Sequence, residues 1–471
     1  MEKEAQAFSV KRAEVEFHNF ASLGEPERAL EHYARQNQNR ASVIGNHRAF
    51  IGGMTPFLEI GANVGHSSFM LAQQFGAKGF ALDISADALR HGRREFEMPV
   101  VRVAGDAAKL PFRDESLQFV MAFQMLSQFS DIEQVFVEVK RVLRPGGVFF
   151  FADEPMLRLL SLRLYRAPYY NLMRPWERKL YDWGLLGYLV KDVIGAQQEE
   201  SFGIRQNHTM YLADWKRLIG KHFAAMEYET FVPERGWGER LVKRLAARRG
   251  SGGARLLGGT LAAFCKKAGT SEFTETPCET PVAALENFLR CPDCAGQFEQ
   301  NFEGTLRCGS CGYLARNEGG VYTVLPTRER VELYPGDRAD IIDFSLPGHE
   351  ARLGEGWGEL EGRDGAQYRW VGAHASASLA PVRATPLRLR IRGHAPEQVF
   401  AQGEPVRVRV KVNGQQLPDL VLHRAGLFIY EADVPQSASY TVDVACSPTF
   451  SVPPDVRVFS VTFSMLRLVP R

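Results

Sequence analysis

The stretch LEIGANVGH, residues 58–66, decides the fold because an apolar strand turns there directly into a helix. The glycines at 61 and 65 let the backbone approach a ligand closely, and the N–H groups of the turn and of the helix N-terminus favour an anionic group. Such a turn is by itself also compatible with a purely structural strand–helix connection. The segments that follow decide between these two interpretations of the turn.

Short apolar runs alternate with helical periodicity from residue 55 to about 267, which predicts βαβ units and a mostly parallel sheet. The helix before the fifth strand should stop at RPGG, residues 144–147, because proline cannot continue it and glycine supplies the turn. We expect a doubly wound, seven-stranded, Rossmann-like α/β domain over residues 1–268. The predicted strands are 57–60, 79–83, 100–104, 117–123, 147–152 and two more near 226–232 and 257–265.

Two carboxylates stand at the ends of successive predicted strands. Asp83 ends the second run, and Asp106, followed by Ala107, comes directly after the third. Ligands of open α/β sheets bind at these carboxyl ends, where Asp83 can accept from a ribose diol and Asp106 from an adenine amino group. Each acid alone is more often a helix cap or a solvated loop residue. Together with the glycine turn, these two carboxylates make three sites in register at successive strand ends, which favours a bound nucleoside.

The motifs LEIGANVG, ALDIS, GDAAKLPF, SLQFVMAFQMLSQF and LRPGG occur in the order typical of class I S-adenosylmethionine (SAM)-dependent methyltransferases, and residues 55–155 resemble the type 11 branch of that family. The resemblance implies SAM as cofactor. It implies that the methionyl end is held by Glu59, Gly61 and Gly65, the ribose by Asp83, the adenine by Asp106 and Ala107, and that Gln124 lines the methyl-transfer side.

Asn63 departs from the family pattern, in which a middle glycine is usual. Asparagine tolerates a positive φ better than other residues with a side chain, so we expect Asn63 to remain part of the cofactor turn. A catalytically silent homologue stays open as an alternative. A dinucleotide is disfavoured as cofactor, because the frame of residues 61–65 lacks the second glycine that a pyrophosphate requires.

A long insertion, residues 153–225, follows the fifth strand, and in the resembling family such insertions form the lid that selects the acceptor. Its first part interleaves arginine and lysine with leucine, tyrosine and tryptophan. A lid packed on the sheet with its cationic heads in water is the simpler interpretation, and contact with an apolar or phosphate-bearing ligand or with a membrane surface is the alternative. Candidate general bases are Asp153, Glu154 and His208, although a structural role is the ordinary one for such a histidine.

Two CxxC pairs, CPDC at 291–294 and CGSC at 308–311, follow a linker predicted for residues 269–287. Two such turns deliver the thiolates of Cys291, Cys294, Cys308 and Cys311 to one tetrahedral Zn²⁺, which would be structural because no position stays open. A redox dithiol is disfavoured, because two pairs at this spacing are present. The flanking sequence resembles short zinc-ribbon domains associated with methyltransferases. We expect a zinc ribbon over residues 288–326 that shares no ligand with the cofactor site.

Residues 338–471 carry alternating apolar segments and an Asn413-Gly414 turn, which predict an all-β sandwich. The pattern loosely resembles sandwich modules of glycosyltransferases and other surface-polysaccharide enzymes. On that basis Trp357 and Trp370 are candidates for stacking on sugar rings, with a place in the core as the alternative. The resemblance favours a saccharide or lipid-linked saccharide hydroxyl as acceptor. Another small molecule, a lipid or a protein is the alternative acceptor, and a non-catalytic SAM-binding scaffold is the alternative function.

Composition excludes several classes of protein. The 57 lysines and arginines against 55 acids give a net charge of +2, too small to require nucleic acid as a partner. Seven cysteines, an odd number in 471 residues, do not form a disulfide framework. No apolar run reaches the roughly 18 residues that span a bilayer, and the acidic N-terminus lacks the apolar region of a secretory signal. We therefore expect a cytoplasmic protein, with peripheral membrane contact through the lid as an alternative and no prediction of oligomeric state.

Overall fold

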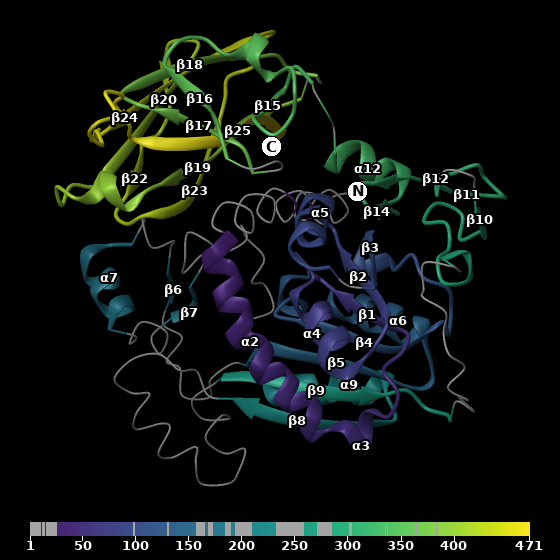
Figure 1. Ribbon diagram of the computed structural model, residues 1–471. Coiled ribbons are helices and arrows are strands. Elements are labelled where there is room, and N and C mark those ends of the chain that lie inside the picture. The colour runs from purple at the N-terminus through teal and green to yellow at the C-terminus, as the bar shows by residue number, and fades with distance from the viewer. Residues whose placement is uncertain are drawn as a thin grey trace.

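The computed structural model describes Lys11, Val15, 26–156 except 98 and 130, 165–167, 173–183, 190–193, 210–231, 259–270 and 285–471 except 301–303, 335, 337, 363–365 and 383–384. Figure 1 shows an N-terminal α/β domain, a small cysteine module (residues 288–326) against its edge, and a β unit (residues 338–471) above it. Most of the predicted linker lies outside the described residues.

A nine-stranded sheet with the order β13-β14-β3-β2-β1-β4-β5-β9-β8 forms the centre of the α/β domain. Seven of its strands confirm the predicted doubly wound fold: β1 (Phe57–Ile60), β2 (Gly79–Asp83), β3 (Val100–Ala104), β4 (Leu117–Phe123), β5 (Leu143–Met156), β8 (Ala225–Phe231) and β9 (Gly259–Lys266). The first five are parallel, whereas β9 pairs antiparallel with β5 and β8. The remaining two strands, β13 (Asn317–Glu318) and β14 (Val321–Thr323), come from the cysteine module.

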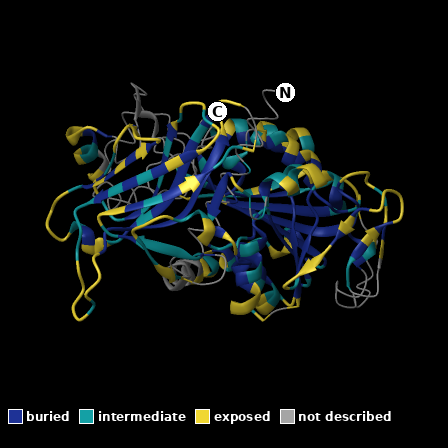
Figure 2. Ribbon diagram, turned by 90° about the horizontal axis from the view of Figure 1, so that it is seen from above, coloured by how far each residue is buried: buried dark blue, intermediate teal, exposed yellow. Residues whose placement is uncertain are grey.

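Helices cover both faces of this sheet, so the central strands β1 to β4 are buried along their whole length. The helices and 3₁₀ turns are α2 (Pro26–Asn46), α3 (Arg48–Ile51), α4 (His66–Phe75), α5 (Ala86–Glu95), η1 (Ala107–Lys109), η2 (Leu126–Gln128), α6 (Ile132–Val142) and α9 (Leu212–His222). Alternate strand residues face opposite layers: Phe57 packs in the cluster that includes α2 and α4, whereas Leu58 packs in the cluster that includes α6 and α9. Figure 2 shows the strands as the most buried part of the molecule.

The cysteine module continues the core of the α/β domain. Its small sheet consists of β10 (Phe298–Gln300), β11 (Leu306–Cys308) and β12 (Leu314–Ala315), and helix α12 (Thr327–Leu333) follows β14. Phe288 packs against Phe80 of β2 with ring centroids 5.3 Å apart. The same apolar cluster contains Cys291 and Cys308, both 1% exposed. The cysteine module therefore shares a hydrophobic core with the α/β domain.

The C-terminal unit consists of two antiparallel sheets around a core of its own, as the sequence predicts. One sheet holds β15 (Ile341–Asp343), β16 (Trp357–Glu361), β17 (Tyr368–Val371), β19 (Leu387–Ala395), β23 (Gly426–Asp433) and β25 (Val461–Pro470). The other holds β18 (His374–Leu379), β20 (Val406–Val412), β21 (Gln415–Gln416), β22 (Leu420–Leu422) and β24 (Tyr440–Ser447). Residues of both inner faces, among them Leu389 and Val442, share one apolar cluster.

The predicted lid is described in parts only. These are β6 (Tyr165–Ala167), α7 (Pro175–Asp182), β7 (Val190–Val193) and the segment that leads into α9. His208 lies outside the described residues. Among the described residues, no helix has the length and apolar character needed to cross a membrane.

Candidate cofactor site and metal centre

The turn between β1 and α4 has the backbone that the sequence predicts. Gly61 and Gly65 have φ values of 68° and 81°, and Asn63 adopts the left-handed region with φ of 51°. A Cβ atom on Gly61 would lie 2.8 Å from the Met125 Sδ atom, so a larger residue would not fit there. Asn63 thus replaces the usual glycine without breaking the turn.

Glu59 ties β1 to the start of α4 beneath this turn. Its side chain is 1% exposed, and its Oε2 atom accepts from the Ser68 backbone N–H (2.7 Å) and the Ser68 hydroxyl (2.6 Å). Burial raises the pKa of Glu59 to about 7, against the opposing effects of Ser68 and Arg40. The turn therefore rests on a polar anchor inside the domain.

Asp83 connects the turn to the next helix. Its Oδ2 atom accepts from the Asn63 N–H at 2.7 Å, and its Oδ1 atom accepts from the Ser85 N–H at 2.8 Å. The carboxylate is 3% exposed and fixed at the carboxyl end of β2. Each oxygen keeps a lone pair for a further donor, which is what a ribose diol requires.

Asp106 occupies the corresponding position after β3. Its Oδ1 atom accepts from the Ala108 N–H at 2.9 Å, which caps η1, and its Oδ2 atom accepts from Lys11 Nζ at 2.7 Å. Lys11 also contacts Glu329 Oε1 at 2.7 Å. Burial would lower the pKa of Lys11, but the two carboxylates outweigh it and raise that pKa. Ala107, 6% exposed, lies beside Asp106 at the start of η1.

The predicted acceptor side involves the residue after β4 and the last part of β5. Gln124 is exposed with a φ of 53°, and Asp153 has a φ of 63°. The Asp153 side chain is 37% exposed, and its Oδ2 atom accepts from Arg40 Nη2 at 2.9 Å and Nε at 3.2 Å. Of the predicted bases, Asp153 is therefore the one that the described residues leave open to an acceptor.

Glu154 points the other way. It is fully buried, and its carboxylate accepts from the N–H groups of Met125 (2.8 Å), Leu126 (2.8 Å) and Ser127 (3.0 Å). Burial raises the pKa of Glu154 to about 7, and the three backbone donors oppose that rise. The geometry assigns Glu154 to holding η2 beside the turn.

Arg40 contacts this site without any signal in the sequence, because it lies within a polar stretch of α2. It is 6% exposed, and its Nη1 atom donates to Ser67 Oγ at 2.8 Å and lies 3.0 Å from His66 Nε2. Its guanidinium also lies 4.0 Å from the centre of the Phe123 ring. Arg40 thus joins the helix that follows the turn to the acceptor side.

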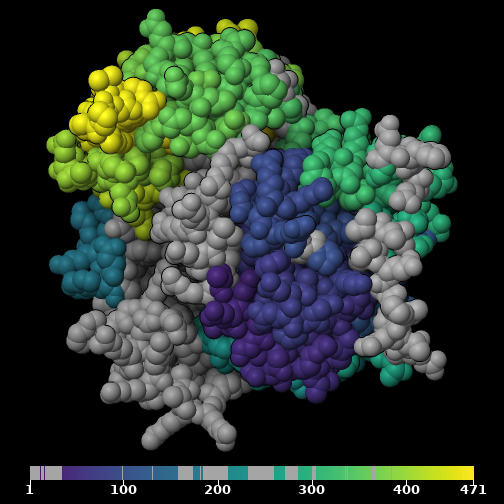
Figure 3. All heavy atoms as spheres, in the orientation of Figure 1, coloured from purple at the N-terminus to yellow at the C-terminus, as the bar shows by residue number. Residues whose placement is uncertain are grey.

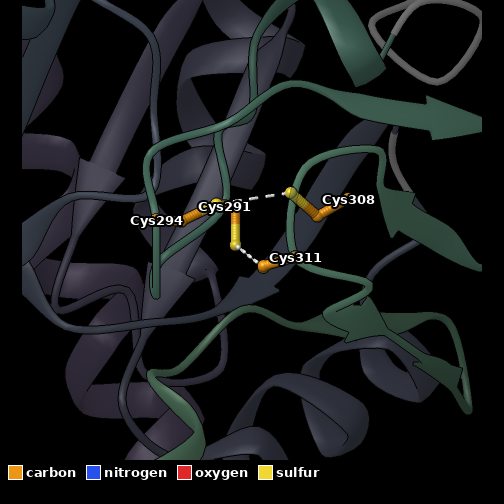
Figure 4. Close-up of side chains that lie close together, drawn as sticks. All are labelled: Cys291, Cys294, Cys308 and Cys311. Atoms are coloured by element: carbon orange, nitrogen blue, oxygen red, sulfur yellow. Dashed lines mark hydrogen bonds between the residues drawn. The ribbon is translucent and has the colours of Figure 1, made fainter.

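The four cysteines converge as predicted (Figure 4). Their sulfur atoms lie within 4.8 Å of one another, with Cys291 to Cys311 at 3.6 Å and Cys294 to Cys308 at 3.5 Å. A tetrahedral zinc with Zn–S bonds of about 2.3 Å would place the sulfurs about 3.8 Å apart, so the set fits Zn²⁺. Gly296 fits closely here: a Cβ atom would lie 3.1 Å from two of the sulfurs.

Comparison with known proteins agrees with this geometry over the first domain. Residues 58–151 match the family model described as "Methyltransferase domain". The chain is 30% identical over 145 residues to the phthiotriol/phenolphthiotriol dimycocerosates methyltransferase of Mycobacterium tuberculosis, covering 30% of this chain and 54% of that protein. It is 31% identical over 127 residues to the fatty-acid O-methyltransferase of Mycolicibacterium smegmatis, covering 26% and 42%. The chain thus spans about half the length of these relatives.

Two solved structures are similar over half of the chain. The complex of the Haloferax volcanii Trm112 methyltransferase activator with its methyltransferase matches at a TM-score of 0.34 and 17% identity, covering 54% of this chain and 98% of that chain. Haemonchus contortus phosphoethanolamine N-methyltransferase 2 with S-adenosyl-L-methionine matches at 0.33 and 16%, covering 49% and 52%.

The sheet order and the turn of residues 61–65 form a Rossmann-like domain, within which residues 58–151 match the model of a methyltransferase domain. The rest of the chain adds a four-cysteine module with the geometry of a metal site and a β-sandwich.

Proposed function

We propose that the protein transfers the methyl group of SAM to an oxygen atom of a lipid or lipid-linked saccharide. The observation that carries the transfer activity is the set of polar groups at the carboxyl ends of β1, β2 and β3. There, Asp83 is fixed by the backbone of the glycine turn, and Asp106 stands one strand further along. The names of the relatives support a lipid acceptor, and the loose resemblance of the sandwich supports a saccharide part.

SAM supplies an electrophilic methyl group on a sulfonium. Holding an acceptor oxygen in line with the carbon–sulfur bond of bound SAM would contribute much of the catalysis. The role of the glycine turn, Asp83 and Asp106 is to fix the donor. A carboxylate acceptor needs no base, whereas a hydroxyl acceptor must lose its proton. In this proposal Asp153 takes that proton, which is supported by its partial exposure and by its contact with Arg40.

Cofactor binding tests the first half of the proposal. We expect the full chain to bind SAM and S-adenosylhomocysteine in calorimetric titration. Asp83→Asn should weaken that binding about 5- to 150-fold, because one ribose contact and one backbone contact lose a charged acceptor. Asp87→Asn is the matched control, since Asp87 pairs with Arg90 on the surface of α5. Equal affinities of wild type and Asp83→Asn would contradict the assignment of Asp83.

Acceptor identity is tested with methyl-labelled SAM, using fatty acids, isolated lipids and lipid-linked saccharides as separate acceptors. Label in a lipid-linked saccharide or in a lipid supports the proposal, and label confined to protein or to water-soluble metabolites contradicts it. Asp153→Asn should reduce transfer to a hydroxyl while leaving the affinity for S-adenosylhomocysteine intact. Binding of SAM without transfer to any of these acceptors would favour the scaffold function.

A further inference from the structure

The cysteine module is built into the edge of the sheet that carries the cofactor loops. Strand β14 pairs parallel with β3, and the Val324 N–H donates to the Ala104 carbonyl at 2.8 Å, two residues before Asp106. On the other side of the same loop, the Arg290 N–H donates to the Pro111 carbonyl at 3.0 Å. The loop that holds Asp106 is thus bonded to the module at both of its ends. Figure 3 shows the teal-green atoms of the module lying against the blue atoms of the domain.

The end of α12 reaches the other cofactor loop. The Tyr334 hydroxyl donates to the Ile84 carbonyl and accepts from the Ala86 N–H at 2.9 Å. These groups bracket Ser85, whose N–H holds Asp83. The Ile84 and Tyr334 side chains also pack against a small apolar cluster of Val15, Leu325 and Leu333. The turn that orients Asp83 is therefore enclosed by residues that follow the cysteines.

The two cysteine knuckles (the CxxC turns at residues 291–294 and 308–311) contact residues 325–327 at the start of α12, the second of them through the neighbouring Tyr313. Asp293, inside the first CxxC, accepts from the Thr327 N–H at 2.9 Å and from the Thr327 hydroxyl at 2.6 Å. Tyr313, directly after the second CxxC and its glycine, donates to the Leu325 carbonyl at 2.6 Å. A metal bound by the four cysteines would fix both knuckles and, through them, the start of α12. Glu329 on the same helix reaches Asp106 through Lys11.

We propose that residues 321–334 are an internal brace of the cofactor site, so that metal bound by the four cysteines strengthens SAM binding. The inference rests on the proposed binding of SAM. The contacts run without a break from the knuckles through Asp293 and Thr327 to Tyr334 and the loop after Asp83. Because coupling between two sites is reciprocal, bound S-adenosylhomocysteine strengthens metal retention by the same factor.

Two variants that keep all four cysteines test the brace. Tyr334→Phe removes the hydroxyl that spans Ile84 and Ala86, and Thr327→Val removes the hydroxyl on Asp293. Each should weaken the binding of S-adenosylhomocysteine at least about 5-fold, the lower end of couplings measured between linked sites. Tyr440→Phe is the matched control, because its hydroxyl accepts from the Ser437 N–H inside the sandwich.

Linkage is measured on the full chain by competing for zinc with a chromophoric chelator, with and without saturating S-adenosylhomocysteine. The ligand should raise zinc affinity by the factor that zinc raises ligand affinity, and Tyr334→Phe should reduce both factors together. The proposed brace is wrong if both variants bind S-adenosylhomocysteine as tightly as Tyr440→Phe does and zinc affinity is the same with and without that ligand. If the wild-type chain binds neither SAM nor S-adenosylhomocysteine, the proposed function itself fails.

Discussion

The two units attached to the methyltransferase domain are joined to it in different ways. The sandwich has a separate core, in which Leu389 and Val442 meet within one cluster of C-terminal residues. The cysteine module has no such independence, because Phe288 and Cys291 belong to the same cluster as Phe80 of β2. The number of residues in each unit accounts for this difference. A unit of about 40 residues buries too little surface to stand by itself, whereas about 130 residues build a complete core.

Truncation should have the largest effect on folding, and the effect should differ between the two attached units. A chain ending at residue 336 keeps the module and should fold and bind S-adenosylhomocysteine. A chain ending at residue 268 loses β14 and Phe288, so the edge of β3 and the side chain of Phe80 become exposed, and it should aggregate or unfold. The shared core therefore predicts that residues 1–268 do not suffice for a folded domain that binds the cofactor.

Circular dichroism and calorimetry of the two fragments decide this point. A well-folded 1–268 fragment with full cofactor affinity would show that the module is attached only peripherally.

Loss of the metal should have the next largest effect. We expect one zinc per chain, and Cys308→Ser should release it and lower the melting temperature of the methyltransferase domain, since structural zinc sites supply roughly 10 kcal/mol or more of binding free energy. Elemental analysis and differential scanning calorimetry measure both effects. The control is Cys446→Ser in the sandwich core, which should retain full metal content. Iron instead of zinc, or full metal content in Cys308→Ser, would contradict the assignment.

The effect of replacing Trp357, which packs against the sandwich core, should be confined to the sandwich. The Trp357 ring packs 5.3 Å from Phe344 and 6.0 Å from Phe463, and its N–H donates to the Ser376 carbonyl at 2.6 Å. Trp357 is half-buried and packs against the sandwich core, so Trp357→Ala should destabilise the sandwich by at most about 3 kcal/mol, the lower end for fully buried aromatic residues, without changing cofactor affinity.

Chemical unfolding followed by fluorescence measures this loss, with Trp183→Ala as the control because Trp183 is 58% exposed. If Trp357→Ala weakens glycan binding and leaves stability intact, Trp357 is a sugar platform. Trp370 is held in a similar way, with its N–H on Glu361 at 3.1 Å and its ring 5.0 Å from Phe459.

The free energy of unfolding of the methyltransferase domain should depend on pH, an effect smaller than those above. Folding raises the pKa of Glu154 from 4.5 to about 7 through burial. The folded state therefore binds the proton more tightly, and this stabilisation is complete below pH 4.5 and is lost as the pH rises through about 7. A shift of this size corresponds to at most about 3 kcal/mol.

Urea unfolding at pH 5 and pH 7.5 should show this loss of stability. Glu154→Gln should reduce the difference between the two pH values, and Glu59, whose pKa burial also raises to about 7, should account for the remainder. Glu359→Gln, at an exposed site of the sandwich, should leave this difference unchanged. An unchanged difference in Glu154→Gln would show that another group titrates.

Local patterns in the sequence determined the strands β1 to β4, the positions of Asp83 and Asp106 at their ends, and the four cysteines. Hydrophobic periodicity and short spacings encode these features within a few residues, so neighbouring residues suffice to predict them. The left-handed turn at Asn63 belongs to the same class, because the requirement for a positive φ lies in the turn itself.

Only the tertiary structure decided which distant residues complete the site. Arg40 meets Asp153 across 113 positions, and Tyr334 meets Ile84 across 250. Pairing of β14 with β3 involves three residues of a strand too short to carry a pattern of its own. The neighbouring acids Asp153 and Glu154 separate for the same reason. At an irregularity in the pairing of β5 with β9, Asp153 contacts Arg40, whereas Glu154 accepts from the N–H groups at η2. Such contacts depend on how whole elements pack, and no short window of the sequence contains that information.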